Sequence, residues 1–146
     1  GNWQRVPTLE EALDVAGRAI GMILELKVEG IGNEACAIVK RTGFPGPLIY
    51  ASFLMPELQR VRQTDPDAKI MVLQHRRLPP DPVADVVALD ASHVGLHFST
   101  VTPMLLQTYH NLGRQVFVYT VNEPQDIQRM RNLGVDGIIS DFPDRI

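Results

Sequence analysis

The sequence has one cysteine, no long apolar run and almost no excess of charge of either sign. A single cysteine, Cys36, excludes a disulfide within the chain, and free cysteine usually packs as a small apolar residue, here on a helix. No apolar run approaches the roughly 20 residues of a membrane span, and nothing near the N-terminus resembles a signal peptide. The net charge of -3 gives no reason to expect binding to nucleic acid or to an anionic membrane. The sequence therefore predicts a soluble chain and leaves its compartment open.

Motifs for several kinds of active site are missing as well. The sequence contains no Gly-rich loop ending in Lys-Ser/Thr for phosphates, no His-Glu-x-x-His zinc motif and no nucleophile elbow. The chain does have 146 residues, of which 45% are hydrophobic and 21% charged, as in an ordinary globular protein. We expect residues 1–146 to form a single domain.

The clearest pattern lies in residues 115–143, QVFVYTVNEPQDIQRMRNLGVDGIISDFP, which predict a strand, a helix and a second strand. The first strand is β-branched and aromatic, Pro124 suits a first helical turn, and Gly134 suits a helix end. Apolar residues at helical spacing fill the interval, and GIIS at 137–140 follows as a short apolar strand. A strand, crossover helix and parallel strand make one β/α unit.

The same unit repeats along the chain. The Pro103 helix, ending at Gly113, has the spacing of the Pro124 helix, which gives a period of 21 residues. We expect Leu105, Leu106, Tyr109 and Leu112 to face inward. Thr8 and Glu11 form a capping box for a first helix. The other elements that we expect are helices at 9–19, 33–42, 56–64 and 83–87, and strands at 22–29, 48–53, 69–74 and 93–98.

These patterns predict six strands alternating with helices, and right-handed crossovers place the strands in sequential order. Eight such units close a (β/α)8 barrel of about 250 residues, and this chain has six. Two interpretations are open at this point: an open, doubly wound sheet, or a β/α barrel without its first quarter.

Four stretches resemble the glycerophosphodiester phosphodiesterase family. They are VPTLEEALDVA, ILELK, ASFLMPELQRVRQTDPDAKI and VTPMLLQTYHNLGRQVFVYTVNEPQDIQRMRNLGVDGIISDFPD, in the family's order from Val6 onward. The last is the most specific, because strand, Val-Asn-x-Pro turn, helix, Leu-Gly-Val-Asp-Gly and Asp-x-Pro-Asp follow without gaps. The resemblance implies an α/β fold of parallel (β/α) TIM-barrel type, incomplete, with about six β/α units.

The resemblance also implies a reaction. The family hydrolyses glycerophosphodiesters to an alcohol and glycerol 3-phosphate, using a divalent metal and two histidines. By the family's pattern the chain starts just before the third barrel strand, so the His-Arg-Gly, Pro-Glu-Asn-Thr and Glu-x-Asp motifs and the second histidine are not in it. The segment His75-Arg76-Arg77 lies after the fifth strand and does not correspond to His-Arg-Gly. We therefore expect this chain alone to be inactive.

Two residues match the family's third-strand Glu-x-Lys. The resemblance implies that Glu25 is a metal ligand, and a carboxylate at the carboxyl end of a barrel strand faces the active-site mouth. It implies that Lys27 lies on the phosphate side, where its charge can neutralise a phosphate oxygen. A buried ion pair between Glu25 and Lys27 is the alternative for both. Because one carboxylate does not hold Mg²⁺ or Ca²⁺ firmly, we expect such a metal to bind weakly or not at all.

Three further residues are expected to bind substrate. Tyr119 stands where the family usually has Trp, near the glycerol, with plain core packing as the alternative. His97 ends the sixth barrel strand, with a hydrogen-bonded structural role as the alternative, and Ser52 ends the fourth. Asp141 is expected to brace the turn before Pro143.

Three hypotheses follow for the whole chain. The first is a member of the phosphodiesterase family whose ligand is a glycerophosphodiester or glycerol 3-phosphate. The second is a non-catalytic module that keeps the pocket floor and binds a phosphate compound or a partner chain, and the third is an unrelated doubly wound domain. In a six-stranded arc each end strand has one unpaired edge. We therefore expect that these edges either pair in self-association or are covered by a further N-terminal segment. The remaining polar groups are interpreted as surface groups: His93, His110, and the Arg60–Arg62 pair on a solvated helix face.

Overall fold

A computed structural model describes residues 5–146 as one parallel sheet with helices between its strands. The six strands are hydrogen-bonded in sequential order, β1 to β6, and every neighbouring pair is parallel. The strands are β1 Met22–Glu25, β2 Leu48–Ser52, β3 Lys69–Leu73, β4 His93–His97, β5 Gln115–Tyr119 and β6 Gly137–Ile138. The helices are α1 Leu9–Ala16, α2 Gly32–Thr42, α3 Met55–Thr64, α4 Ala84–Ala88, α5 Pro103–Asn111 and α6 Pro124–Leu133, with 3-10 turns η1 Phe98–Thr100 and η2 Pro143–Arg145.

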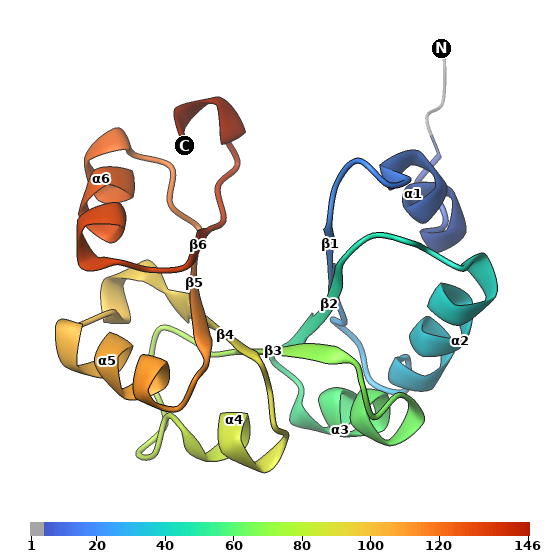
Figure 1. Ribbon diagram of the computed structural model, residues 1–146, viewed down its shortest axis with the longest axis horizontal. Helices are drawn as coiled ribbons and strands as arrows, with labels where there is room; N and C mark the ends of the chain where they lie inside the picture. Colours follow the sequence, from blue (N-terminus) through green and yellow to red (C-terminus); the bar gives the residue numbers. More distant parts are fainter. Residues whose placement is uncertain (1–4) are drawn as a thin grey trace.

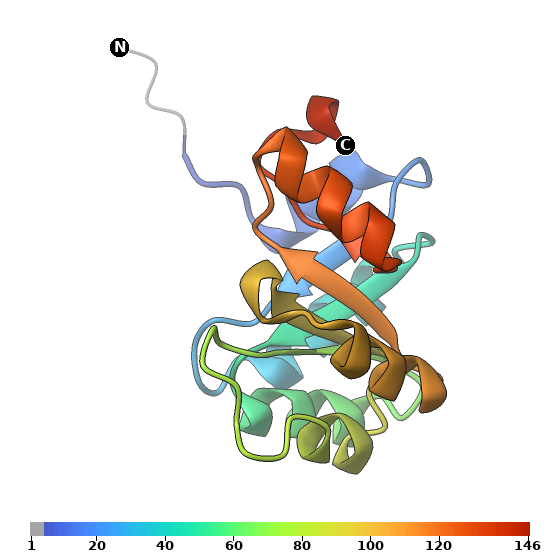
Figure 2. The ribbon, with the colours of Figure 1, turned by 90° about the vertical axis from the view of Figure 1, so that its left-hand side faces the viewer.

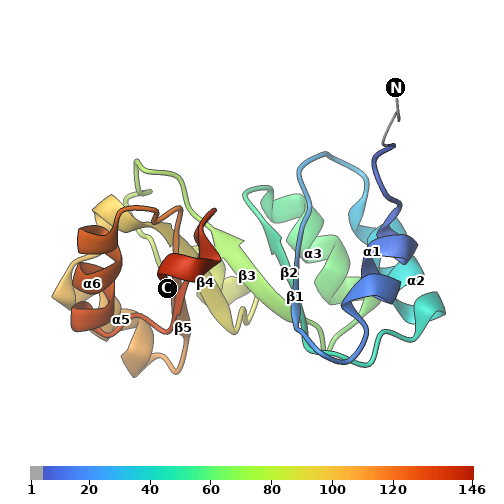
Figure 3. The same ribbon diagram turned by 90° about the horizontal axis from the view of Figure 1, so that it is seen from above.

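The sheet curls into an arc with the helices on its outer side (Figure 1). Strands β1 and β6 form the two ends of the arc and face an open gap. Figure 3 looks into this gap, with α1 and α2 along one arm and α5 and α6 along the other. Because the strand order never reverses, the prediction of an incomplete TIM-type barrel is confirmed and the doubly wound alternative is wrong.

Local sequence signals account for the ends of several helices. Thr8 accepts a hydrogen bond from the Glu11 N–H at 3.2 Å, and the Glu11 carboxylate accepts one from the Thr8 N–H at 3.0 Å, which completes the predicted capping box. Proline occupies the first turn of α5 and α6, and α6 ends at Gly134 in the left-handed conformation. All helices are short, and none within residues 5–146 is long and apolar enough to cross a membrane.

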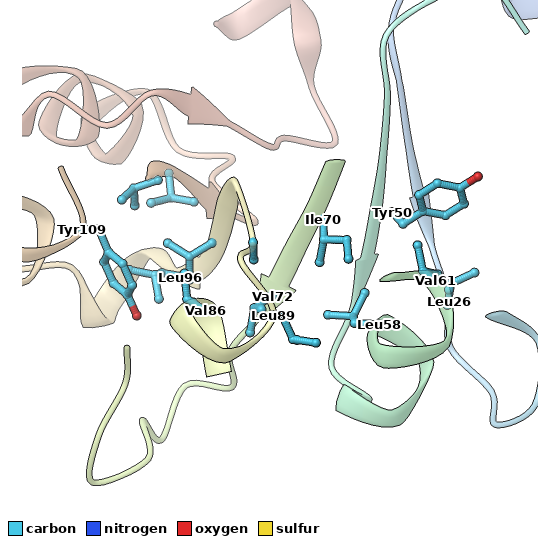
Figure 4. Packing of buried hydrophobic residues seen from close by; sticks show 14 of the residues in the cluster. Leu26, Tyr50, Leu58, Val61, Ile70, Val72, Val86, Leu89, Leu96 and Tyr109 are labelled. Atoms are coloured by element: carbon cyan, nitrogen blue, oxygen red, sulfur yellow. The ribbon is translucent and has the colours of Figure 1, made fainter. Parts of the chain in front are cut away.

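The outer face of the sheet forms the main core. Aliphatic side chains from the strands meet the inner faces of the helices, and Figure 4 shows this layer from Leu26 to Tyr109. Helices α5 and α6 lie over the outer side of one arm of the arc (Figure 2), and Leu106, Tyr109, Ile127 and Met130 of these helices belong to the core. Cys36 is buried in α2 without a disulfide, as predicted. A fully buried aliphatic side chain contributes roughly 1.5–3 kcal/mol, so this layer supplies most of the stabilisation of the arc.

The inner, concave face is a smaller apolar layer. Ala51, Met71 and Leu73 are buried there and pack with Ile49, Phe53 and Phe117. Gly95 of β4 makes room for this layer, because a Cβ at that position would lie 2.5 Å from Leu73 Cδ2. These side chains therefore cover the sheet on its concave side, and the space beyond them opens toward the gap.

The predictions that were wrong include two element ends and the inward orientation of one residue. The helix expected at 9–19 ends at Ala16, where Gly17 adopts a positive φ of 55°. The strand expected at 22–29 ends at Glu25, so Glu29 does not share a strand face with Glu25. Leu112, expected to face inward, caps the end of α5 and is 42% exposed.

Arg62 was also misinterpreted as part of a solvated helix face. Its guanidinium donates to four main-chain carbonyls, those of Pro66, Ala68, Leu89 and Asp90, at 2.7–3.2 Å. Arg62 thereby joins α3 to the loop before β3 and to the loop before β4, at the amino ends of the strands. This contact connects segments that are distant in sequence, which a helical pattern does not reveal.

Candidate functional site

A cavity of about 390 Å³ opens at the carboxyl ends of the strands, on the concave side. It is lined by residues of β1, β2, β3 and β5 and of the segments that follow β2, β5 and β6: Ile23, Glu25, Ala51, Phe53, Met71, Leu73, Tyr119, Thr120 and Ile139. A hollow of similar size between α1 and the loop after α2 contains none of the predicted site residues. The carboxyl rim is where β/α-barrel enzymes place their chemistry.

Glu25 is the last residue of β1, and its carboxylate lines this cavity. The Lys27 ammonium lies 3.7 Å from Glu25 Oε2, and the two side chains are 76% (Lys27) and 35% (Glu25) exposed. The two residues are therefore an ion pair at the rim, exposed rather than buried. Because both side chains are exposed, both groups remain accessible to a ligand. An exposed pair of this kind contributes little to stability.

Tyr119 ends β5 and lies on the same cavity as Glu25, although the two residues are far apart in sequence. Its hydroxyl donates to the Gln74 carbonyl, and its ring meets Phe53 edge-on with centroids 5.9 Å apart. Burial, and secondly the charge of Glu25, raise the pKa of the Tyr119 phenol. The phenol is therefore a neutral hydrogen-bond donor in the wall of the cavity.

His97 ends β4 directly beside Tyr119, its register partner, and the two rings meet edge-on at 5.8 Å. Its Nδ1 accepts from the Ser99 N–H at 3.2 Å and lies 2.7 Å from Ser99 Oγ, so the imidazole also caps the turn η1. Burial, followed by the nearby charge of Arg76, lowers the pKa of His97, which makes the ring neutral at pH 7. His97 thus has a local structural role in addition to its place at the rim.

Ser52 ends β2 and is completely buried. Its hydroxyl donates to the Leu26 carbonyl at 2.6 Å and accepts from the Leu54 N–H at 2.9 Å. These two bonds direct the hydroxyl to the main chain instead of the cavity. Contact of Ser52 with a substrate stays a prediction that these contacts do not support.

The rim continues to the end of β6 through a network around Asn122. Its side-chain amide donates to Asp141 Oδ2 at 3.1 Å, and its side-chain oxygen accepts from the Asp141 N–H at 3.0 Å. Ser140 Oγ donates to the same oxygen at 3.1 Å. The predicted bracing of the turn before Pro143 by Asp141 is confirmed.

Two other residues near the rim, Glu57 and His75, have contacts that the sequence patterns did not predict. Glu57 of α3 is fully buried and accepts from the N–H groups of Gly30 and Gly32 at 2.7 Å each. Burial alone would raise the pKa of Glu57, but those N–H donors and the charge of Arg60 outweigh it and hold the pKa below its usual value. His75 stacks on Phe53 with centroids 4.4 Å apart.

Of the remaining two histidines, both interpreted as surface groups, His110 is at the surface and His93 is not. His93 is buried in the concave face, with Ser92 Oγ 2.7 Å from its Nδ1 and the Phe117 ring edge-on at 5.3 Å. Burial lowers the pKa of His93. His110 is exposed, but its Nε2 lies 2.7 Å from Asp136 Oδ2, which also accepts from the Val116 N–H. The spacing of these residues carried no signal of either contact.

The side chains at this rim do not fit a metal ion by themselves. Within residues 5–146, no group of three or more His, Cys, Asp or Glu side chains is placed to hold one. Glu25 supplies a single carboxylate, and Mg²⁺ or Ca²⁺ requires several oxygen ligands. For a divalent metal, which the family generally uses, the described residues at this rim offer one candidate ligand, Glu25.

Comparisons with known proteins agree with this architecture. Among curated proteins, the chain is 27% identical to a putative glycerophosphodiester phosphodiesterase of Bacillus subtilis, and the match covers 98% of this chain and 61% of that protein. It is 28% identical to a glycerophosphodiester phosphodiesterase of Caldanaerobacter subterraneus with the same coverage. The chain thus spans about three fifths of the length of these relatives. The comparisons favour the phosphodiesterase interpretation over a module of separate function.

Solved structures show the same fold. A putative glycerophosphoryl diester phosphodiesterase of Silicibacter pomeroyi superimposes with a TM-score of 0.85 and 32% identity, over 95% of this chain and 54% of that one. A phosphodiesterase of Oleispira antarctica, solved with its product sn-glycerol-3-phosphate, gives 0.86 and 25% identity, over 96% of this chain and 59% of that one.

The curled parallel sheet, with its polar groups on the carboxyl rim, is part of a TIM-type barrel of the kind that carries enzymes. The model of the glycerophosphoryl diester phosphodiesterase family matches residues 2–145, and the chain belongs to this family.

The meeting of Glu25 and Tyr119 at one cavity can be tested in metal-free buffer. The substitution Glu25→Gln removes a negative charge beside the phenol, so the pKa of Tyr119 is expected to fall, as measured by NMR titration of the tyrosine ring carbons. Glu29→Gln, four residues along the same segment, is the control and should leave this pKa unchanged. Equal values in both variants would contradict the shared site.

Proposed function

We propose that this chain supplies the glycerol-phosphate-binding part of a glycerophosphodiester phosphodiesterase. The reaction of such an enzyme splits the phosphodiester with water and yields glycerol 3-phosphate and an alcohol. The observation that carries the proposal is that Glu25 and Tyr119 line one cavity at the carboxyl rim, in a chain whose residues 2–145 match this family. A bound sn-glycerol-3-phosphate in the Oleispira relative supports the choice of ligand.

Each rim residue is suited by its chemistry to a different part of the ligand. Lys27 is an exposed ammonium that can neutralise a phosphate oxygen, and its partner Glu25 orients it from 3.7 Å. The rings of Phe53 and Tyr119 form an apolar wall against which the carbon side of glycerol can pack. His97 is neutral and can hydrogen-bond a hydroxyl or phosphate oxygen with the ring nitrogen that Ser99 does not occupy.

Binding is proposed to be separable from hydrolysis in residues 1–146. Splitting a phosphodiester requires a group that activates water and one that protonates the leaving alcohol. Ser99 holds one nitrogen of His97, and His75 is stacked on Phe53, so neither is arranged as an acid/base pair in the described part of the chain. We therefore expect negligible turnover of glycerophosphocholine by this chain, with or without added Mg²⁺ or Ca²⁺.

The test is titration calorimetry with sn-glycerol 3-phosphate. Saturable binding is expected in the unsubstituted chain, and Lys27→Ala should weaken it about tenfold or more, because a charge-assisted hydrogen bond contributes roughly 1.5–3 kcal/mol. Lys40→Ala removes an exposed lysine from α2, away from the rim, and is the matched control. Binding that survives Lys27→Ala unchanged would refute the assignment of Lys27, and turnover above background would refute the expected inactivity.

We also propose that the chain self-associates through the ends of the arc. In the sheet formed by residues 5–146, β1 and β6 each have a neighbour on one edge only. Ile23 of β1 is 41% exposed and lines the open cavity, so apolar surface lies exposed beside this unpaired edge. Unpaired strand edges of this kind tend to pair with another chain. Two arcs that fill each other's gap would cover both features.

Sedimentation velocity over a wide range of protein concentration tests this association. We expect a monomer–dimer equilibrium that Ile23→Asp shifts toward monomer, since it places a charge on the apolar edge. Val15→Asp changes a residue that is 88% exposed on α1 and should leave the equilibrium unaltered. A monomer at every concentration would contradict the proposal.

A further inference from the structure

Glu25 and Lys27 lie on the segment that joins β1 to α2. Two buried polar side chains, Ser52 and Glu57, hydrogen-bond to the main chain of this segment. We propose that Ser52 and Glu57 are positioning residues: they hold the segment from Glu25 to Gly32 in the one conformation that places Glu25 and Lys27 on the rim. Neither of them touches the ligand.

The first anchor acts on Leu26, which stands between Glu25 and Lys27. The Leu26 N–H donates to the Ala51 carbonyl at 2.8 Å, and the Leu26 carbonyl accepts from Ser52 Oγ at 2.6 Å. Its side chain is 2% exposed in the outer core. Both polar groups of the Leu26 main chain and its side chain are thus fixed, which leaves its two neighbours to project toward solvent.

Ser52 is well suited to this role because it is itself fixed. Its side chain is 0% exposed, and its hydroxyl accepts from the Leu54 N–H at 2.9 Å while it donates to Leu26. A serine hydroxyl has one proton to donate, and that proton is used by the Leu26 carbonyl. The strand β1 ends at Glu25 because the carbonyl of the next residue, Leu26, accepts its hydrogen bond from the Ser52 side chain and not from the main chain of β2.

The second anchor acts on the far end of the segment. Glu57 Oε1 accepts from the Gly30 N–H and Oε2 from the Gly32 N–H, both at 2.7 Å, while Arg60 pairs with the same carboxylate. Gly30 has a positive φ of 82°, and a Cβ on Gly32 would lie 2.9 Å from the Glu57 carbonyl oxygen. The turn before α2 is therefore shaped around this carboxylate, whose charge-assisted bonds are stronger than neutral ones.

Fixing the segment matters for binding because Lys27 is a long, 76% exposed side chain on a loop. Ligand binding must immobilise such a side chain, and a rigid main chain beneath it lowers that entropic cost. A binding group keeps its productive geometry only when supporting packing and hydrogen bonds hold it there. A loss of about tenfold in affinity is the expected scale for removal of either anchor.

The inference rests on the proposed binding of sn-glycerol 3-phosphate, and a double-mutant cycle tests it. Ser52→Ala should weaken binding about tenfold in the unsubstituted chain and have little further effect in the Lys27→Ala background, because Ser52 acts through Lys27. If Ser52 instead contacts the ligand itself, the two losses multiply, which would overturn the proposal. Ser92→Ala is the control: it removes a hydroxyl at the amino ends of the strands, where Ser92 Oγ lies 3.5 Å from the Ile70 carbonyl.

Amide hydrogen exchange supplies a readout that does not depend on the ligand. Ser52→Ala should speed exchange at Leu26 and Leu54, and Glu57→Gln at Gly30 and Gly32, about tenfold or more relative to amides of β4 and β5. Glu57→Gln also tests the proposal if Ser52→Ala does not fold, since the amide replaces one accepting oxygen by a donor. Unchanged exchange in the folded variants would overturn the anchoring.

Failure of the proposed binding function and failure of the positioning role give different results. Absence of binding in the unsubstituted chain refutes the proposed function, and exchange then decides the anchoring alone. Binding that is intact in both Ser52→Ala and Glu57→Gln refutes the positioning role while the proposed function stands.

Discussion

The arrangement depends on the main-chain pairing of six parallel strands in the order in which they occur along the chain. Parallel pairing brings every carboxyl end to the same edge, so residues that end different strands meet without any direct sequence relation. This is how Glu25 of β1 and Tyr119 of β5 come to line one cavity. The helices cover only the outer face, and the curl leaves the concave face free to open at the rim.

The chain uses polar side chains differently on the two ends of this sheet. At the amino ends, Arg62 donates to four main-chain carbonyls, and His110 and Asp136 join α5 to the strand β5. At the carboxyl ends, Ser52 and Glu57 satisfy main-chain groups beneath the rim, while Glu25 and Lys27 remain exposed. A buried polar group left without its partner costs roughly 1–3 kcal/mol, so these internal bonds constrain the loops that carry the site.

Sequence patterns were sufficient wherever the determining interaction is local. The Thr8–Glu11 capping box, the prolines of α5 and α6 and the 21-residue period gave the right elements, because each signal lies within one turn or one β/α unit. Patterns failed where the partner is distant in sequence. Glu57 and Arg62 resemble solvated helix residues until the loops that they bind are in place, and the end of β1 is set by Ser52, which lies 26 residues further along the chain. Glu25 and Tyr119 were placed by resemblance to a family, and their convergence follows from the barrel topology.

The central claim is that the carboxyl rim of the arc is a binding site for glycerol phosphate. Addition of sn-glycerol 3-phosphate to the isotope-labelled chain, followed by amide chemical-shift mapping, tests it directly. The largest shifts are expected at the ends of β1 and β5, around Leu26–Lys27 and Tyr119–Thr120. Shifts confined to the amino ends of the strands, around Asp65–Ala68, or no shifts at saturating ligand, would contradict it.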